Sequence, residues 1–180
     1  MRTLLSKSLM ITVLLCLGCA QTPGTPTKFA DTDALLNVVK QTIKQITIEE
    51  FKKMMDAEDP YVLIDVRLND EHDAGYIPGT VNIPRGVLEF RIANEAFWED
   101  EGMYVPLKED NLIIYCRSGN RSALATQSLD QLGFSNVYSL EGGFRAWHKS
   151  FPELTQNKLP VIEQAATGHQ VAAEEDAGGC

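Results

Sequence analysis

One segment of the chain reads Asn111-Leu112-Ile113-Ile114-Tyr115-Cys116-Arg117-Ser118-Gly119-Asn120-Arg121-Ser122, and the fold can be worked out from it. Residues 111–115 are almost entirely apolar, which is typical of a strand that is covered on both faces. After Ser122, apolar side chains recur at the spacing of one helix face. These are Leu124, Ala125, Leu129 and Leu132. Gly133 is suited to end this helix in the left-handed conformation. The segment therefore predicts a buried strand, a short loop that begins at Cys116, and a helix.

The same alternation of strand and helix extends over most of the chain. Further short strands are predicted at 61–66, 81–84 and 136–140. Thr47 and Glu50 form the pattern of a capping box, which opens a helix that runs to Met55. A second helix is predicted over residues 87–98, and the last one starts at Gly142. Strands that alternate with helices predict an α/β fold with a mainly parallel central sheet and helices on both faces.

The loop after the strand at 111–115 carries the residues with the most chemical meaning. Cys116 stands at the carboxyl end of that strand, where ligands bind in sheets of this kind. A loop that contains Gly119 lets several backbone amides point inward as an anion-binding nest, and the helix start adds the positive end of its dipole. With the cations Arg117 and Arg121, this environment should lower the pKa of the Cys116 thiol and favour the nucleophilic thiolate. The alternative, a buried inert cysteine, is the usual reading of an isolated cysteine.

Composition limits the classes of function. The chain has 180 residues, with 16 basic and 25 acidic side chains and a formal net charge of −9. This length suggests one domain with appendages. Because phosphate binding draws on clustered Lys and Arg, the acidic balance argues against a nucleic-acid partner. Any anion that the protein handles must therefore be met by a local site.

The first twenty residues have the three-part pattern of an export signal. Arg2 and Lys7 precede an apolar run over residues 9–17, which is too short to span a bilayer permanently. Residues 17–20 resemble a bacterial lipoprotein box, in which Cys19 would be lipidated. Ordinary cleavage after Ala20 is the alternative, and the mass of the mature chain distinguishes the two. We therefore expect an exported protein of the bacterial cell envelope, either soluble in the periplasm or held at the membrane only by a lipid. Loss of the signal leaves 14 basic and 25 acidic residues, a net charge of −11.

Two segments flank the predicted catalytic domain at residues 46–152. Residues 21–45 begin with Thr, Pro, Gly and Gln, which is typical of a flexible tether, and end in an amphipathic helical pattern. Residues 153–180 are predicted as a mobile tail, because 165–180 has few large apolar groups. Cys180, at the end of this tail, is interpreted as a chance terminal thiol. Its alternative role is to resolve an oxidised Cys116.

No metal site and no cofactor are predicted. The histidines His72, His148 and His169 lack the spacing of metal ligands, and there is no Cys-x-x-Cys pair. Gly142-Gly143 is not a phosphate loop, since the lysine and the rest of that pattern are absent. Phe144 and Trp147 stand at helical spacing and are predicted to lie in the core rather than to form a platform for a ligand.

Four motifs, in order over residues 46–152, resemble the rhodanese family of sulfurtransferases. The first is Leu63-Ile64-Asp65-Val66-Arg67, and the second is Glu71 with Gly75-Tyr76-Ile77-Pro78-Gly79-Thr80-Val81-Asn82-Ile83-Pro84. The third is the loop Cys116-Arg117-Ser118-Gly119-Asn120-Arg121-Ser122, and the fourth is Leu140-Glu141-Gly142-Gly143-Phe144-Arg145-Ala146-Trp147. Tyr76 and Thr80 depart from the residues that many members have, His and Ala, but both lie in a structural motif.

The resemblance implies a three-layer fold with a five-stranded sheet, and a ping-pong transfer of sulfur without a cofactor. Cys116 would take the outer sulfur of thiosulfate or a persulfide donor and become a persulfide, which a thiol or cyanide acceptor would discharge. Residues Arg117, Ser118, Gly119, Asn120 and Arg121 would bind the anionic sulfur donor. Asp65 and Arg67 would support the base of the loop. Their alternative reading is an aspartate that forms a turn and a solvated arginine.

Two other functions fit the same fold. The cell-cycle phosphatases and arsenate reductases related to rhodaneses have a loop one residue longer than the four residues that separate Cys116 and Arg121 here. A phosphatase also needs an acid for its leaving group, and only Glu71 and His72 are candidates. The other alternative is a non-catalytic module that carries sulfide or binds a partner in the envelope, since a fold alone does not fix function.

Overall fold

The apolar segments of the chain form the strands of one sheet in the computed structural model, which describes residues 28–157. The strands are β1 (Lys44–Ile46), β2 (Val62–Asp65), β3 (Thr80–Asn82), β4 (Asn111–Tyr115) and β5 (Asn136–Leu140). They lie in the order β1-β5-β4-β2-β3, and every neighbouring pair is parallel. The predicted α/β fold with a central five-stranded sheet is confirmed, and the sheet is entirely parallel.

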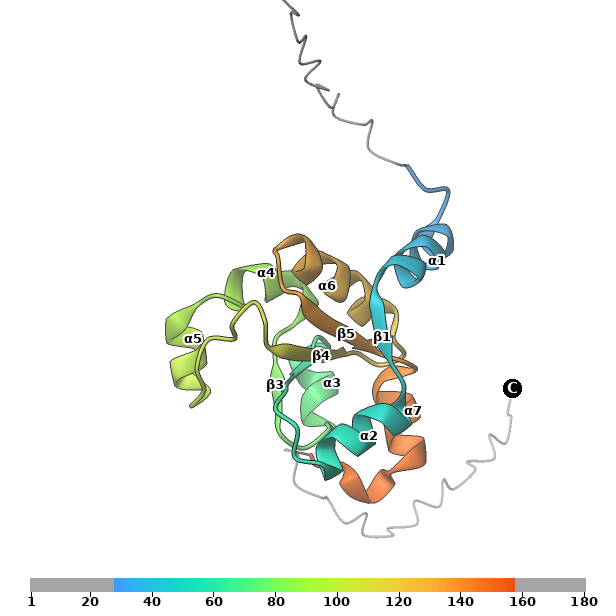
Figure 1. Ribbon diagram of the computed structural model, residues 1–180. Helices are drawn as coiled ribbons and strands as arrows, with labels where there is room; N and C mark the ends of the chain where they lie inside the picture. The colour runs from blue at the N-terminus through green and yellow to red at the C-terminus, as the bar shows by residue number, and fades with distance from the viewer. Residues whose placement is uncertain (1–27, 158–180) are drawn as a thin grey trace, which may run out of the picture.

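Helices cover both faces of this sheet (Figure 1). They are α1 (Thr32–Thr42), α2 (Ile48–Asp56), α3 (Asn69–Asp73), α4 (Leu88–Arg91), α5 (Glu95–Asp100), α6 (Asn120–Gln131) and α7 (Gly143–Ser150), with short 3-10 turns at Arg85–Val87 and Pro152–Leu154. Strand β4 shows how the layers are built, because its side chains alternate between the two faces. Leu112 and Ile114 pack in the layer of α4, α5 and α6, whereas Ile113 and Tyr115 pack with α2 and α7. Both faces of β4 are therefore buried, as its continuous apolar run predicted.

Local signals in the sequence set most element boundaries. The capping box at Thr47 is present, since its hydroxyl accepts from the backbone N–H of Glu50 and the Glu50 carboxylate accepts from that of Thr47. Gly133 follows α6 with a positive φ, as predicted. Strand β1 was not marked by an apolar run, because Lys44 and Gln45 at the edge of the sheet are exposed and only Ile46 is buried.

Residues 87–98, predicted to be helical, form two short helices instead of one continuous helix. The chain forms α4, then breaks, and restarts as α5 at Asn94, whose side-chain oxygen accepts from the backbone N–H of Phe97. Trp98 is fully buried, and its indole N–H donates to the carbonyl of Ile92 at 2.9 Å. The cap at Asn94 therefore turns the chain so that Trp98 reaches the core.

The two ends of the described chain belong to the domain. Helix α1 packs on α6 through Leu36, Val39 and Ala123. Beyond α7, the indole N–H of Trp147 donates to the carbonyl of Leu154, and the backbones of residues 76 and 156 pair. Residues 153–157, predicted as the start of a mobile tail, are thus packed on the domain.

Several predictions concern parts of the chain outside the described residues. The export signal, lipidation at Cys19, the start of the tether and the thiol of Cys180 all lie there, and they stay predictions. Between residues 28 and 157, no helix is long and apolar enough to cross a membrane.

Candidate active site

The parallel register of the sheet brings the first and third motifs together. Asp65 ends β2 and pairs in register with Tyr115, the last residue of the neighbouring strand β4. Cys116 follows Tyr115 directly, and Arg67 follows Asp65 by two residues. Because the carboxyl ends of parallel strands meet at one edge, the predicted nucleophile and its two predicted supports lie at the same edge of the sheet.

The loop after Cys116 folds back toward its sulfur. The backbone N–H of Gly119 donates to the Cys116 Sγ, with a nitrogen–sulfur distance of 3.2 Å. Helix α6 begins at the next residue, so the positive end of its dipole lies beside the sulfur. The Cys116 residue is only 1% exposed. One backbone amide of the predicted nest, that of Gly119, thus points at the sulfur at the start of α6.

The amino end of α7 holds this loop from the other side. The backbone N–H of Phe144 donates to the carbonyl of Cys116 at 2.8 Å, and that of Arg145 donates to the carbonyl of Arg117 at 3.0 Å. This approach depends on Gly143, because a Cβ there would overlap the Cys116 carbonyl oxygen and its φ is +57°. The sequence placed Gly142-Gly143 at the start of the last helix and excluded a phosphate loop, but it did not indicate this contact. The position of this glycine pair directly after a strand was the available signal for a close backbone approach.

Arg121 lies near the nucleophile and is held by Glu71. Its two terminal nitrogens donate to the two carboxylate oxygens of Glu71, each at 2.7 Å. This hydrogen bonding raises the pKa of Arg121, and the nearby Cys116 adds to the effect. The same pair holds the pKa of Glu71 below its usual range. Glu71 is therefore a carboxylate that orients an arginine, and it does not have the raised pKa of a general acid.

A buried network lies at the carboxyl end of β2, beside the strand β4 that leads into the loop. Arg67 donates through Nε and Nη2 to both oxygens of Asp65, and through Nη2 to the carbonyl of Gly75 at 2.7 Å. His72 Nδ1 lies 2.9 Å from Asp65 Oδ2 and carries the proton, because a carboxylate only accepts. Burial works against the charge on Asp65, but the hydrogen bonds from His72 and Arg67 outweigh it and hold the pKa below its usual range.

These contacts settle the competing interpretations of the network residues. Asp65 does form a turn, since its carboxylate accepts from the backbone N–H of Arg67. Arg67, however, is only 3% exposed and stacks over the Phe144 ring at 4.2 Å, so the reading as a solvated arginine is wrong. His72 is buried as well, with its Nδ1 engaged by Asp65.

A cleft of about 350 Å³ opens beside the loop. Its walls come from α3 and the residues on either side of it, from the loop after β4 and from α7, and they include Arg67, Glu71, Arg117, Phe144, Arg145 and His148. Trp147 is buried in the core as predicted. Phe144 packs against the same core cluster, but it is half-buried and also lines this cleft. Arg145 and His148 were not singled out for this site, because their place depends on how α7 packs.

Of the remaining loop residues, Ser118 is half-buried and Asn120 is exposed. The side-chain oxygen of Asn120 accepts from the Lys40 ammonium at 2.8 Å, so this side chain is tied to α1. Ser122, which follows the loop, is buried and shares a hydrogen bond with Ser139 of β5 at 2.9 Å. These contacts fix the start of α6 against the sheet and its neighbouring helix.

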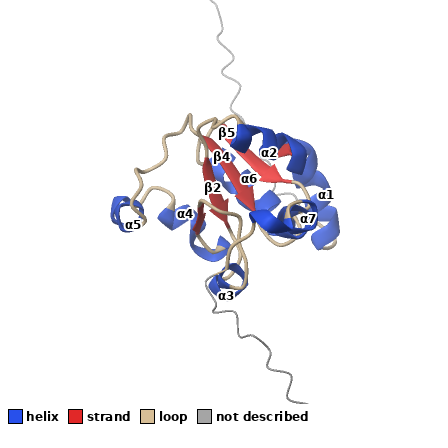
Figure 2. Cartoon of the chain, turned by 90° about the horizontal axis from the view of Figure 1, so that it is seen from below, coloured by secondary structure: helices blue, strands red, loops and turns tan. Residues whose placement is uncertain are grey.

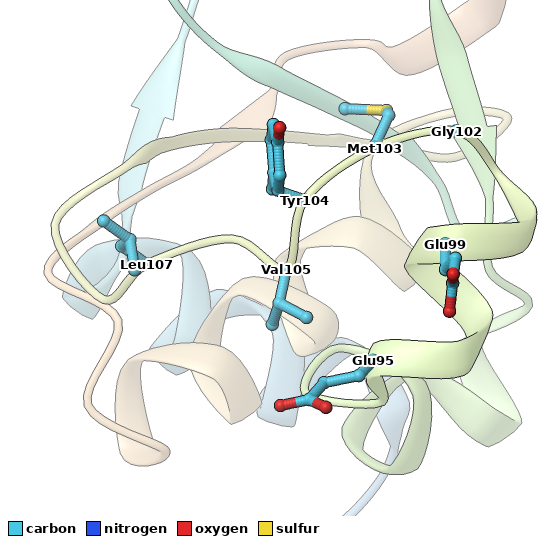
Figure 3. Close-up of a pocket in the computed structure, with 7 residues that line it drawn as sticks. All are labelled: Glu95, Glu99, Gly102, Met103, Tyr104, Val105 and Leu107. Carbon is cyan, nitrogen blue, oxygen red and sulfur yellow. The ribbon is translucent and has the colours of Figure 1, made fainter.

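A larger hollow of about 730 Å³ lies elsewhere, around α5 and the segment that follows it (Figure 3). It is lined by Glu95, Glu99, Met103, Tyr104 and Leu107 among others, and it contains none of the predicted site residues. Helices α5 and α7 lie at opposite sides of the molecule in Figure 2. In residues 28–157, no group of three or more His, Cys, Asp or Glu side chains is arranged to hold a metal ion.

The close approach at Gly143 gives a testable expectation for stability. We expect Gly143→Ala to lower the free energy of unfolding by about 3 kcal/mol, because the methyl group meets backbone atoms and the positive φ is strained. Gly86→Ala is the matched control, since a Cβ at Gly86 meets nothing within 4 Å. Urea titrations of both variants measure the difference. Equal stability of the two would show that α7 does not hold the loop in this way.

The buried network gives an expectation for pH dependence. A carboxyl whose pKa is lowered in the folded state contributes stability above its unfolded pKa, near 3.8, and that contribution is lost as the pH falls through the folded pKa. We expect Asp65→Asn to cost about 3–5 kcal/mol at pH 7, because it leaves Arg67 buried without a counterion. As the pH falls below about 4, the variant should also lose less stability than the parent. The exposed Asp59→Asn is the control, and an Asp65→Asn variant as stable as this control would refute the network's role.

Comparisons with known proteins agree with this geometry. The family model described as Rhodanese-like domain matches residues 47–150. Thiosulfate sulfurtransferase GlpE of Pseudoalteromonas translucida is 30% identical over 110 residues, which cover 61% of this chain and 93% of that protein. YrkF of Bacillus subtilis, whose name assigns it provisionally to the sulfur carriers, is 35% identical over 106 residues. That match covers 59% of this chain and 51% of YrkF, so the chain spans about half the length of that relative.

Solved structures show the same relationship. The human single-domain sulfurtransferase TSTD1 is 32% identical, with a TM-score of 0.55, over 58% of this chain and 95% of that one. RPA3614 of Rhodopseudomonas palustris, described as a protein of unknown function and possible tyrosine phosphatase, is 30% identical with a TM-score of 0.56. That match covers 71% of this chain and 96% of RPA3614. The four motifs gather around one cysteine loop, and the family model matches most of the described residues. The chain therefore belongs to the rhodanese-like domain family.

Proposed function

We propose that the chain is a sulfurtransferase that moves a sulfane sulfur from thiosulfate or a persulfide donor to a thiol or cyanide acceptor. The observation that carries the proposal is the position of the Cys116 sulfur, which accepts a hydrogen bond from the Gly119 amide at the start of α6. A sulfur held in this way is stabilised when it carries negative charge. The named sulfurtransferases among its relatives support the class of reaction.

In the first half-reaction, the Cys116 thiolate attacks the outer sulfur of thiosulfate. The new bond joins Cys116 Sγ to that sulfur, and the sulfur–sulfur bond of thiosulfate breaks with its electron pair on the departing sulfite. The products are a persulfide anion on Cys116 and a sulfite dianion, so charge is conserved. In the second half-reaction, an acceptor nucleophile removes the outer sulfur and restores the thiolate.

Each part of the site serves this chemistry. The amides of the loop and the helix start stabilise the charge on the sulfur and on the persulfide. Arg121, oriented by its two hydrogen bonds to Glu71, supplies a permanent cation beside Cys116. Asp65 and Arg67 act as positioning residues. Asp65 holds Arg67, Arg67 contacts the Phe144 ring, and the Phe144 amide donates to the carbonyl of Cys116.

A phosphatase is favoured less by the same site. Cleavage of a phosphate ester generally needs an acid for the leaving group, whereas sulfite leaves without one. Glu71 is held as a carboxylate by Arg121, and His72 is engaged with Asp65 inside the domain. The interval of four residues between Cys116 and Arg121 also favours sulfur over a phosphate monoester.

The test of this function measures sulfite release from thiosulfate in the presence of cyanide or a thiol. We expect Cys116→Ser to reduce the rate by at least about a thousandfold, because the serine hydroxyl is a poor nucleophile for sulfur. Tyr104→Phe, at a residue 96% exposed in the larger hollow, serves as a control and should keep the parent rate. Activity that survives in Cys116→Ser would refute the mechanism. No turnover with any sulfane donor would favour the sulfur-carrier module instead.

A further inference from the structure

The cleft beside the loop that follows Cys116 presents two arginines whose charge is not compensated. Within residues 28–157, the guanidinium groups of Arg117 and Arg145 make no ion pair and no hydrogen bond. Both residues are exposed and line the cleft. The other two arginines at this site already form ion pairs, Arg67 with Asp65 and Arg121 with Glu71.

The backbones that carry the two free guanidinium groups are joined to each other next to the nucleophile. Arg117 follows Cys116 directly, and its carbonyl accepts from the backbone N–H of Arg145 at 3.0 Å. Because this bond joins the catalytic loop to α7, both side chains start from rigid backbone at the rim of the cleft. In a chain of net charge −9, such a local excess of positive charge attracts an anion to this point.

The cleft is also larger and more aromatic than a small inorganic donor needs. Its volume of about 350 Å³ is in the range of pockets that hold organic molecules. The Phe144 ring lies against the Arg67 guanidinium on one side and stacks with His148 at a centroid distance of 5.7 Å. A ligand that suits these walls has an organic body as well as negative charge.

We propose that this cleft is the acceptor subsite, and that it selects a small thiol bearing carboxylate groups, which bind Arg117 and Arg145. This inference rests on the proposed sulfur transfer. The acceptor's thiolate attacks the outer sulfur of the Cys116 persulfide and forms a new sulfur–sulfur bond. The bond to Cys116 Sγ breaks, and its electron pair stays on that sulfur as the thiolate. The acceptor leaves as a persulfide anion, so atoms and charge balance without a further reactant.

The test compares glutathione, which has two carboxylates, with its diethyl ester, which keeps the thiol and loses those charges. In the parent protein we expect glutathione to have a KM roughly tenfold below that of the ester. Arg145→Gln should raise the KM for glutathione about three- to fivefold with little change in kcat, and leave the KM for the ester unchanged. Arg145→Lys should restore part of the difference.

Lys149→Gln is the matched control, because it removes the same charge one turn further along α7 from a residue outside the cleft. It should leave the KM for both acceptors unchanged.

Sulfite release from thiosulfate in a single turnover, without acceptor, separates this inference from the proposed function. If that step occurs but Arg145→Gln does not alter the preference for glutathione over the ester, the acceptor subsite is wrong. A rise in the KM for thiosulfate in Arg145→Gln would assign the cleft to the donor and overturn the proposal, whereas absence of sulfite release would refute the sulfur transfer itself.

Discussion

Two backbone hydrogen bonds join the end of β4 to the start of α7, and the site depends on them. The carbonyls of Cys116 and Arg117 accept from the amides of Phe144 and Arg145, across a contact that only Gly143 permits. They hold one side of the loop while the Gly119 amide bonds the sulfur from within. This contact between the loop after β4 and the start of α7 thus positions the nucleophile, the Phe144 ring and the backbones of two arginines. A distortion at Gly143 would therefore alter the loop and the cleft together.

The electrostatics of the site follow from how its arginines are paired. Arg67 is paired with Asp65 inside the domain, so its charge is not available to a ligand. Arg121 is oriented by Glu71 and remains close enough to Cys116 to be affected by it. Arg117 and Arg145 are left without an ion pair in the described part of the chain, at the rim of the cleft. Positive charge at this edge of the sheet is therefore available to an anion.

Local patterns made much of this structure predictable. The apolar run at 111–115 and the helical spacing that ends at Gly133 specified the strand, loop and helix around Cys116, because each signal acts over a few residues. The break at Asn94 and the strand β1 were missed, since burial of Trp98 and an edge position beside β5 decide them. The contact at Gly143 and the place of Phe144 in the cleft join segments more than 20 residues apart, which no local pattern reveals. The supporting role of Asp65 and Arg67 was predicted only through the resemblance to rhodaneses.

The central claim is that Cys116 carries the sulfur during transfer. The most direct measurement is the mass of the intact chain after incubation with thiosulfate under non-reducing conditions, followed by mapping of its peptides. We predict a gain of about 32 Da, the mass of one sulfur atom, on the peptide that contains Cys116, and its loss when a thiol is added. No gain in mass, or a gain that persists in Cys116→Ser, would contradict this account.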